Sequence, residues 1–148
     1  LLHTRAANAV PPSYPGLNFS GLMARAESRN LGVIGIRALA AGALADTTER
    51  HPTSLRKGSP ITSTHGLDAD FEQARTFRTL VEEGWAEDLI DASLRFCISQ
   101  AFLSTMLLGL SCLDHLERAA TSVARGPLAE EALARLPELW QGLAAGGR

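Results

Sequence analysis

Two short apolar runs constrain this chain most, residues 32–39 (Gly-Val-Ile-Gly-Ile-Arg-Ala-Leu) and residues 103–108 (Leu-Ser-Thr-Met-Leu-Leu). Each has the length and composition of a strand that is buried on both faces of a parallel sheet. Helical patterns lie between the two runs, and no hairpin signal joins them. Strands that are connected through helices pair in parallel. The sequence therefore predicts an α/β fold of parallel strands with crossover helices.

The remaining segments predict helices and one long loop. Apolar residues recur at helical spacing over residues 18–29, 68–83, 86–99, 113–125 and 128–143. In the third helix we expect Asp91 and Arg95 to face away from the apolar side, and in the fourth we expect Leu113, Leu116 and Val123 to mark that side. Pro137 should kink or split the last helix. Residues from about 38 to 67 form a polar loop, which either covers a binding site or is disordered.

Charge and cysteine usage exclude several classes of protein. The formal net charge is −2 and no basic run is present, so we expect no nucleic-acid partner. Every apolar stretch is interrupted well before the roughly 20 residues that cross a bilayer, so we expect no membrane association. Cys97 and Cys112 have neither disulfide nor metal spacing, which together with the absence of a signal-peptide pattern predicts a reduced, cytoplasmic setting and no metal.

Candidate chemistry lies where the two strands end, because ligands of parallel α/β folds bind at the carboxyl ends of strands. Residues 37–44 carry small side chains that let a ligand approach the backbone, and residues 108–117 pass through Gly109 into a helix whose start suits an anion. Each glycine-containing junction also fits ordinary turn chemistry. Arg37, at the end of a strand expected to be buried, needs a partner: a cofactor phosphate, a substrate or an acidic residue.

Taken together, the two segments resemble the aldo-keto reductase family. Residues 32–44 look like that family's seventh strand and the loop that wraps the cofactor pyrophosphate. Residues 103–117 look like its eighth strand, its adenosine-phosphate loop and the start of the last barrel helix. The resemblance implies the C-terminal portion of a (β/α)8 TIM-type barrel. Because a complete barrel typically needs about 250 residues, the 148 residues can only form a partial barrel domain.

The resemblance also implies a cofactor site, for NADP or NAD. Its residues along the pyrophosphate would be Leu39, Ala41, Gly42 and Leu44, and those along the adenosine would be Gly109, Leu110, Ser111, His115 and Arg118. Arg37 is a further candidate for a cofactor phosphate because of its charge at the end of the strand, where the residue departs from the family's pattern. The pattern departs from the family at Gly109, where many NADP-preferring members have Lys. His115 is interpreted either as a cofactor contact or as an ordinary surface histidine.

The resemblance implies an NAD(P)H-dependent oxidoreductase that acts on an aldehyde, ketone or sugar carbonyl. The family's catalytic Tyr, Lys, Asp and His come from the first half of the barrel, and none of those motifs is found here. Tyr14, the only tyrosine, lies in a proline-rich connection. We therefore interpret the chain as a fragment that is inactive in isolation. The alternative is a non-enzymatic interaction module or pseudoenzyme subunit that self-associates through exposed sheet edges.

Overall fold

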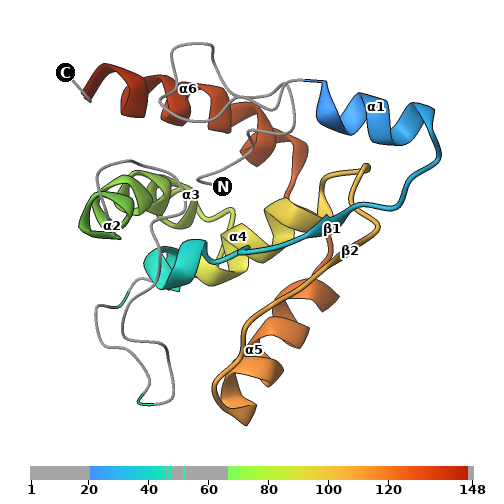
Figure 1. Cartoon of the computed structure of the whole chain (residues 1–148). Coiled ribbons are helices and arrows are strands. Elements are labelled where there is room, and N and C mark those ends of the chain that lie inside the picture. The colour runs from blue at the N-terminus through green and yellow to red at the C-terminus, as the bar shows by residue number, and fades with distance from the viewer. Residues whose placement is uncertain (1–20, 46, 48–51, 53–66, 147–148) are drawn as a thin grey trace.

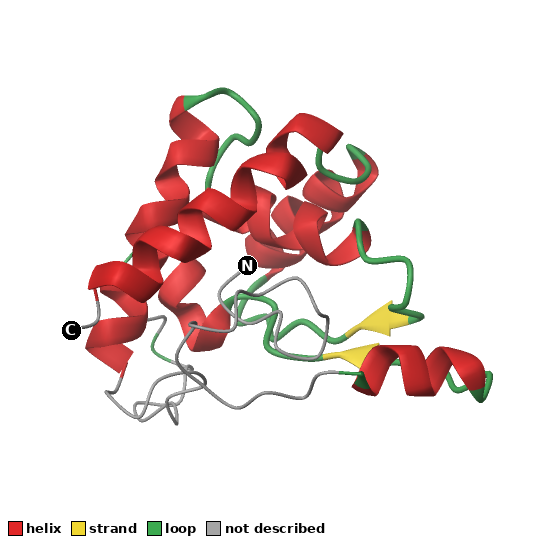
Figure 2. Ribbon diagram, turned by 90° about the horizontal axis from the view of Figure 1, so that it is seen from above, coloured by secondary structure: helices red, strands yellow, loops and turns green. Residues whose placement is uncertain are grey.

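A computed structural model describes residues 21–45, 47, 52 and 67–146. The described chain is mainly helical, with two short strands side by side (Figure 1, Figure 2). In chain order its elements are α1 (Leu22–Ser28), β1 (Ile34–Gly35), the 3-10 helix η1 (Ala40–Ala45), α2 (Leu67–Arg75), the 3-10 turn η2 (Thr76–Arg78), α3 (Thr79–Glu82), α4 (Leu89–Ile98), β2 (Thr105–Met106), α5 (Leu113–Ala124) and α6 (Glu130–Gly146).

The strands β1 and β2 pair in parallel, which confirms the predicted α/β class. Ile34 lies opposite Thr105, and Gly35 lies opposite Met106. The prediction that these strands are buried on both faces is wrong, because Ile34 is 59% exposed and Leu107 is 60% exposed. Among the described residues, these side chains remain uncovered because the core forms among the helices and not on the sheet. The described residues thus contain parallel strands with crossover helices but do not form a barrel.

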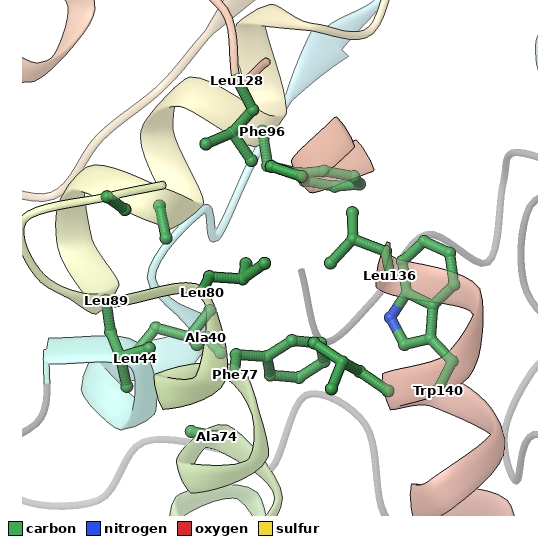
Figure 3. Packing of buried hydrophobic residues seen from close by; sticks show 14 of the residues in the cluster. Ala40, Leu44, Ala74, Phe77, Leu80, Leu89, Phe96, Leu128, Leu136 and Trp140 are labelled. Carbon is green, nitrogen blue, oxygen red and sulfur yellow. The ribbon is translucent and has the colours of Figure 1, made fainter. Parts of the chain in front are cut away.

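The core lies among the helices rather than on the sheet. Phe77 and Leu80 from the α2–η2–α3 region, Leu89 from α4, and Leu136 and Trp140 from α6 point toward one another (Figure 3). Phe77 and Leu80 are completely buried. Each such side chain stabilises the fold by roughly 1.5–3 kcal/mol on burial. The expected helix over residues 68–83 is confirmed as a nearly continuous helical segment that ends at Glu82.

α1 ends near the predicted position but packs less than expected. Asn30, which follows α1, has a φ of 52°, a left-handed conformation typical of the end of a helix. No side chain of α1 is buried.

α5 buries a different face from the one predicted. Leu113 is 65% exposed, Leu116 is 50% exposed and Val123 is 41% exposed, whereas Ala119 and Ser122 are buried. α5 packs closely on α4 and extends away from α2, α3 and α6 (Figure 1). Small side chains allow the two helices to approach, and the short sheet leaves the larger apolar side chains uncovered.

α6 continues through Pro137 as one helix, so the predicted split is wrong. Proline removes one backbone hydrogen bond from a helix. Leu136, Leu139 and Trp140 are each at most 8% exposed, so core packing holds α6 on both sides of Pro137. Among the described residues, no helix is both long enough and apolar enough to cross a bilayer.

Candidate functional site

Parallel pairing brings the two predicted ligand-binding segments to the same edge of the sheet. The Leu107 N–H donates to the Gly35 carbonyl at 2.8 Å, and the Val33 N–H donates to Ser104 Oγ at 3.0 Å. The chain therefore leaves the carboxyl ends of β1 and β2 at neighbouring positions. From there it continues into η1 after β1 and into α5 after β2 (Figure 1).

The segment after β1 has an unusual backbone. Arg37, Ala40 and Ala41 have φ angles of 59°, 49° and 55°, and Gly42 has a φ of 98°. Non-glycine residues adopt such angles only where the surrounding structure holds them, and strained backbone of this kind concentrates at functional sites. One restraint is Ser93 of α4, completely buried, whose hydroxyl donates to the Ala38 carbonyl at 2.6 Å.

In this conformation, part of the backbone that was expected to bind the pyrophosphate forms hydrogen bonds within the segment. The N–H groups of Gly42 and Leu44 both donate to the Leu39 carbonyl, at 2.8 and 3.2 Å. The Leu44 side chain is 1% exposed and belongs to the core, whereas Leu39 and Ala41 are half-buried. Two of the predicted contacts therefore already have a structural role, and η1 occupies part of the segment expected as a loop over residues 38–67.

Arg37 is exposed, contrary to its expected place at the end of a buried strand. The strand is open to solvent at this point, with the neighbouring Ile36 65% exposed, so the guanidinium needs no protein partner to offset burial. No ion pair or hydrogen bond of the Arg37 side chain with another described residue is present. Arg37 is thus a positive charge available at the carboxyl end of β1.

The segment after β2 leads into the start of α5. Gly109 and Leu110 are exposed, and Ser111 is half-buried. The Ser111 N–H donates to His115 Nδ1 at 3.4 Å, so the exposed His115 ring lies over the first turn of the helix. The N-cap residue, Cys112, makes no side-chain capping bond. His115 therefore has a local structural role that sequence reasoning did not anticipate.

Arg118, the last predicted cofactor residue, pairs with an acidic residue of α4. Its Nη2 lies 2.6 Å from Asp88 Oδ2. Asp88 is also the N-cap of α4, where its Oδ1 accepts from the Asp91 N–H at 2.7 Å. The pair borders a polar depression between α4 and α5, lined by Glu87, Asp88, Ile90, Asp91, Glu117, Arg118, Thr121, Ser122 and Arg125.

Sequence reasoning missed a second polar cluster beside this depression. Asp91 was expected to face away from the apolar side of its helix but is 2% exposed. Its carboxylate pairs with Arg95 at 3.4 Å and with Arg125 at 3.1 Å, and Arg125 also pairs with Glu87. The four-residue spacing of Asp91 and Arg95 was the signal for the first pair. The second pair joins residues distant in sequence and had no local signal.

The cluster lowers the pKa of Asp91. Burial alone would raise this pKa, but hydrogen bonds outweigh burial and hold it below its ordinary value of 3.8. The donors are the Glu87 N–H, the Ser122 hydroxyl and the guanidinium groups of Arg125 and Arg95. Arg95 also donates to the carbonyls of Trp85, Gly126 and Pro127, at 3.0, 3.0 and 3.1 Å. This cluster fastens the α5–α6 turn to α4.

The remaining titratable side chains of the described residues do not form a metal site. The described part of the chain contains no group of three or more His, Cys, Asp or Glu residues arranged to hold a metal ion. His3, His51, His65 and Tyr14 lie outside the described residues. Cys97 packs against the core, and burial raises the pKa of its thiol.

Comparison with protein families gives a match over residues 16–141 to the aldo/keto reductase family, which covers both strands, η1 and α5. The chain belongs to the aldo/keto reductase family. The predicted resemblance is thereby confirmed. Searches of curated proteins and of solved structures gave no match. Membership in this family agrees with an oxidoreductase-type function for the α/β chain.

Proposed function

We propose that this aldo/keto reductase-family chain holds the pyrophosphate and adenosine portions of a nicotinamide cofactor, NADP or NAD, in an oxidoreductase that acts on an aldehyde, ketone or sugar carbonyl. The observation that carries the proposal is the parallel pairing of β1 with β2. It sets the segments beginning at Ile36 and Leu107 at neighbouring positions on the carboxyl edge. This is the edge at which parallel α/β folds bind ligands.

Arg37 has the charge and position to bind the pyrophosphate. It is exposed at the end of β1, and a guanidinium forms strong, charge-assisted hydrogen bonds with phosphate oxygens. The Gly42 and Leu44 N–H groups, by contrast, already donate to the Leu39 carbonyl. We therefore give Gly42 and Leu44 a structural role in this segment, and we assign Arg37 to binding the pyrophosphate.

The adenosine portion is assigned to the start of α5. Gly109 and Leu110 leave its approach open, and Ser111, His115 and Arg118 border it with polar groups. The cofactor, when bound, supplies the hydride, and the protein supplies its orientation. We place the residues that transfer a proton to the carbonyl outside this chain, which on its own would be inactive.

A titration of the ¹⁵N-labelled chain with NADH and NADPH, followed by NMR into the millimolar range, tests the assignment. We expect shifts at the backbone of residues 37–41 and 109–115. Arg37→Gln should weaken the binding of both dinucleotides about tenfold, because the guanidinium contacts a group that they share. Arg29→Gln removes an exposed arginine after α1 and serves as the matched control. No binding, or equal binding by the two variants, would refute the proposal.

The exposed apolar surface favours a second function, an interaction module that pairs with a second copy of the chain. Ile34, Ile36 and Leu107 on the sheet and Leu113 and Leu116 on α5 are each at least half exposed. Contiguous exposed apolar side chains commonly mark an interface. Sedimentation velocity tests this alternative: a dimer that Leu116→Glu dissociates supports it, and a monomer with an intact cofactor titration excludes it.

A further inference from the structure

We infer that Asp88 sets the cofactor preference by withholding Arg118 from a 2′-phosphate, so that the site takes NAD(H) in preference to NADP(H). The inference rests on the function proposed above and concerns the adenosine end of the same site. The two cofactors differ only in the phosphate on the adenosine ribose. Discrimination therefore depends on whether a positive charge is available there.

The geometry holds both partners of the pair in place. Arg118 Nη2 and Asp88 Oδ2 are 2.6 Å apart, within the range of a charge-assisted hydrogen bond. The other carboxylate oxygen of Asp88 accepts the Asp91 N–H at 2.7 Å and thereby caps α4. Because the cap fixes the carboxylate at the helix terminus, Arg118 is drawn toward α4.

The charges around Arg118 also disfavour an added phosphate. The depression between α4 and α5 is lined by four carboxylates, those of Glu87, Asp88, Asp91 and Glu117, and by the two guanidinium groups of Arg118 and Arg125. Arg125 is already paired with Glu87 and Asp91. The lining has two more carboxylates than guanidinium groups, and Arg95, which pairs with Asp91 from outside the lining, reduces the formal excess to one negative charge. This excess disfavours a dianionic group.

The two candidate phosphate positions thus differ in available charge. At the end of β1, the Arg37 side chain has no ion pair with another described residue, and it faces a pyrophosphate present in both cofactors. At the start of α5, Gly109 contributes no charge and Arg118 is engaged by Asp88. The site therefore binds both dinucleotides through the pyrophosphate, but it has little positive charge available for the additional phosphate of NADP(H).

The effect of Asp88 should be modest, since Arg118 is 56% and Asp88 39% exposed at the side chain. Exposed ion pairs contribute at most about 1 kcal/mol, which corresponds to about a fivefold change in affinity. We therefore expect the chain to bind NADH more tightly than NADPH by a factor of this order. A larger preference would require contacts beyond this pair.

The test compares NADH and NADPH dissociation constants for the whole chain, by NMR titration, in matched variants. Asp88→Asn keeps an N-cap acceptor and removes the charge, so it should shift the affinity ratio about fivefold toward NADPH. Asp88→Ser, another good N-cap residue, should do the same if the first variant folds poorly. Adding Arg118→Gln to Asp88→Asn should cancel the shift. Glu117→Gln removes one charge from the same depression without releasing Arg118, so it should shift the ratio toward NADPH by less than either Asp88 variant.

The outcomes separate this inference from the function on which it rests. If both dinucleotides bind and the ratio does not respond to either Asp88 variant, the inference fails and the cofactor site stands. A preference for NADPH in the unmodified chain also overturns the inference. If neither dinucleotide binds at millimolar concentration, the proposed function fails, and the inference fails with it.

Discussion

Ser93 and Ala38, 55 residues apart in sequence, are joined by a 2.6 Å hydrogen bond from the Ser93 hydroxyl to the Ala38 carbonyl. This bond fastens the segment after β1 to α4, the helix that precedes β2. It therefore connects the two halves of the candidate site through the protein interior. The left-handed backbone of Ala40 and Ala41 begins two residues after Ala38.

Ser93→Ala should destabilise the chain by about 1–3 kcal/mol, because it leaves the partly buried Ala38 carbonyl without its donor. Urea unfolding measures the change. Ser28→Ala is the matched control: the Ser28 hydroxyl also donates to a backbone carbonyl, that of Arg25, but in an exposed position. We expect the control to change the free energy of unfolding by less than about 0.5 kcal/mol. Equal effects would show that the Ser93 bond does not restrain the segment.

Arg95→Lys should lower the free energy of unfolding by about 2 kcal/mol or more. The guanidinium of Arg95 donates to three carbonyls and to Asp91, and a lysine ammonium lacks the planar geometry to reach all four. Arg75→Lys, at an exposed pair with Glu72, should have almost no effect. Thermal unfolding of both variants checks this prediction. A stable Arg95→Lys variant would mean that the α5–α6 turn is held by other contacts.

Asp91 should make the free energy of unfolding depend on pH in the acidic range. Its pKa in the folded chain is below the ordinary 3.8, so its stabilising contribution is present above pH 3.8 and is lost as the pH falls through the lower folded value. Asp91→Asn should remove this component and also destabilise the chain at neutral pH by about 2 kcal/mol, since it leaves two guanidinium groups without their carboxylate. Urea unfolding from pH 7 to about pH 3 measures both effects. An unchanged pH profile in the variant would contradict the assignment.

Two leucines at helical positions should lower the stability by very different amounts when they are truncated to alanine. Leu136→Ala should cost about 2–5 kcal/mol, because Leu136 is 1% exposed in the core of α6. Leu116→Ala should cost less than about 0.5 kcal/mol, because Leu116 is 50% exposed on α5. Chemical denaturation of dilute protein compares the two. A large loss from Leu116→Ala would show that a second surface covers α5.

Local pattern predicted the identity of most elements. Hydrophobic periodicity and the residues that end helices or form turns predicted the α/β class and the parallel strands. They also predicted the helix that ends near Asn30 and the helices through Phe77 and Leu94, because these signals depend on residues close together in the chain. Family membership was also visible in the sequence, because the two strand–loop segments occur in the family's order. The burial of Asp91 and the exposure of Ile34 could not be predicted from the sequence, because each depends on which surfaces the packed elements cover.

The sequence by itself determined the class of the fold, the positions of its strands and helices, the family and the two segments nominated for the cofactor. Only the tertiary structure decided that Arg118 lies against Asp88, that Ser93 fastens Ala38 and that α5 turns Ala119 rather than Leu116 toward α4. The physical reason is the sequence distance over which each kind of interaction acts. Backbone periodicity is set within a few residues, whereas ion pairs, buried hydrogen bonds and the choice of a buried face arise between residues that meet only when the chain is folded.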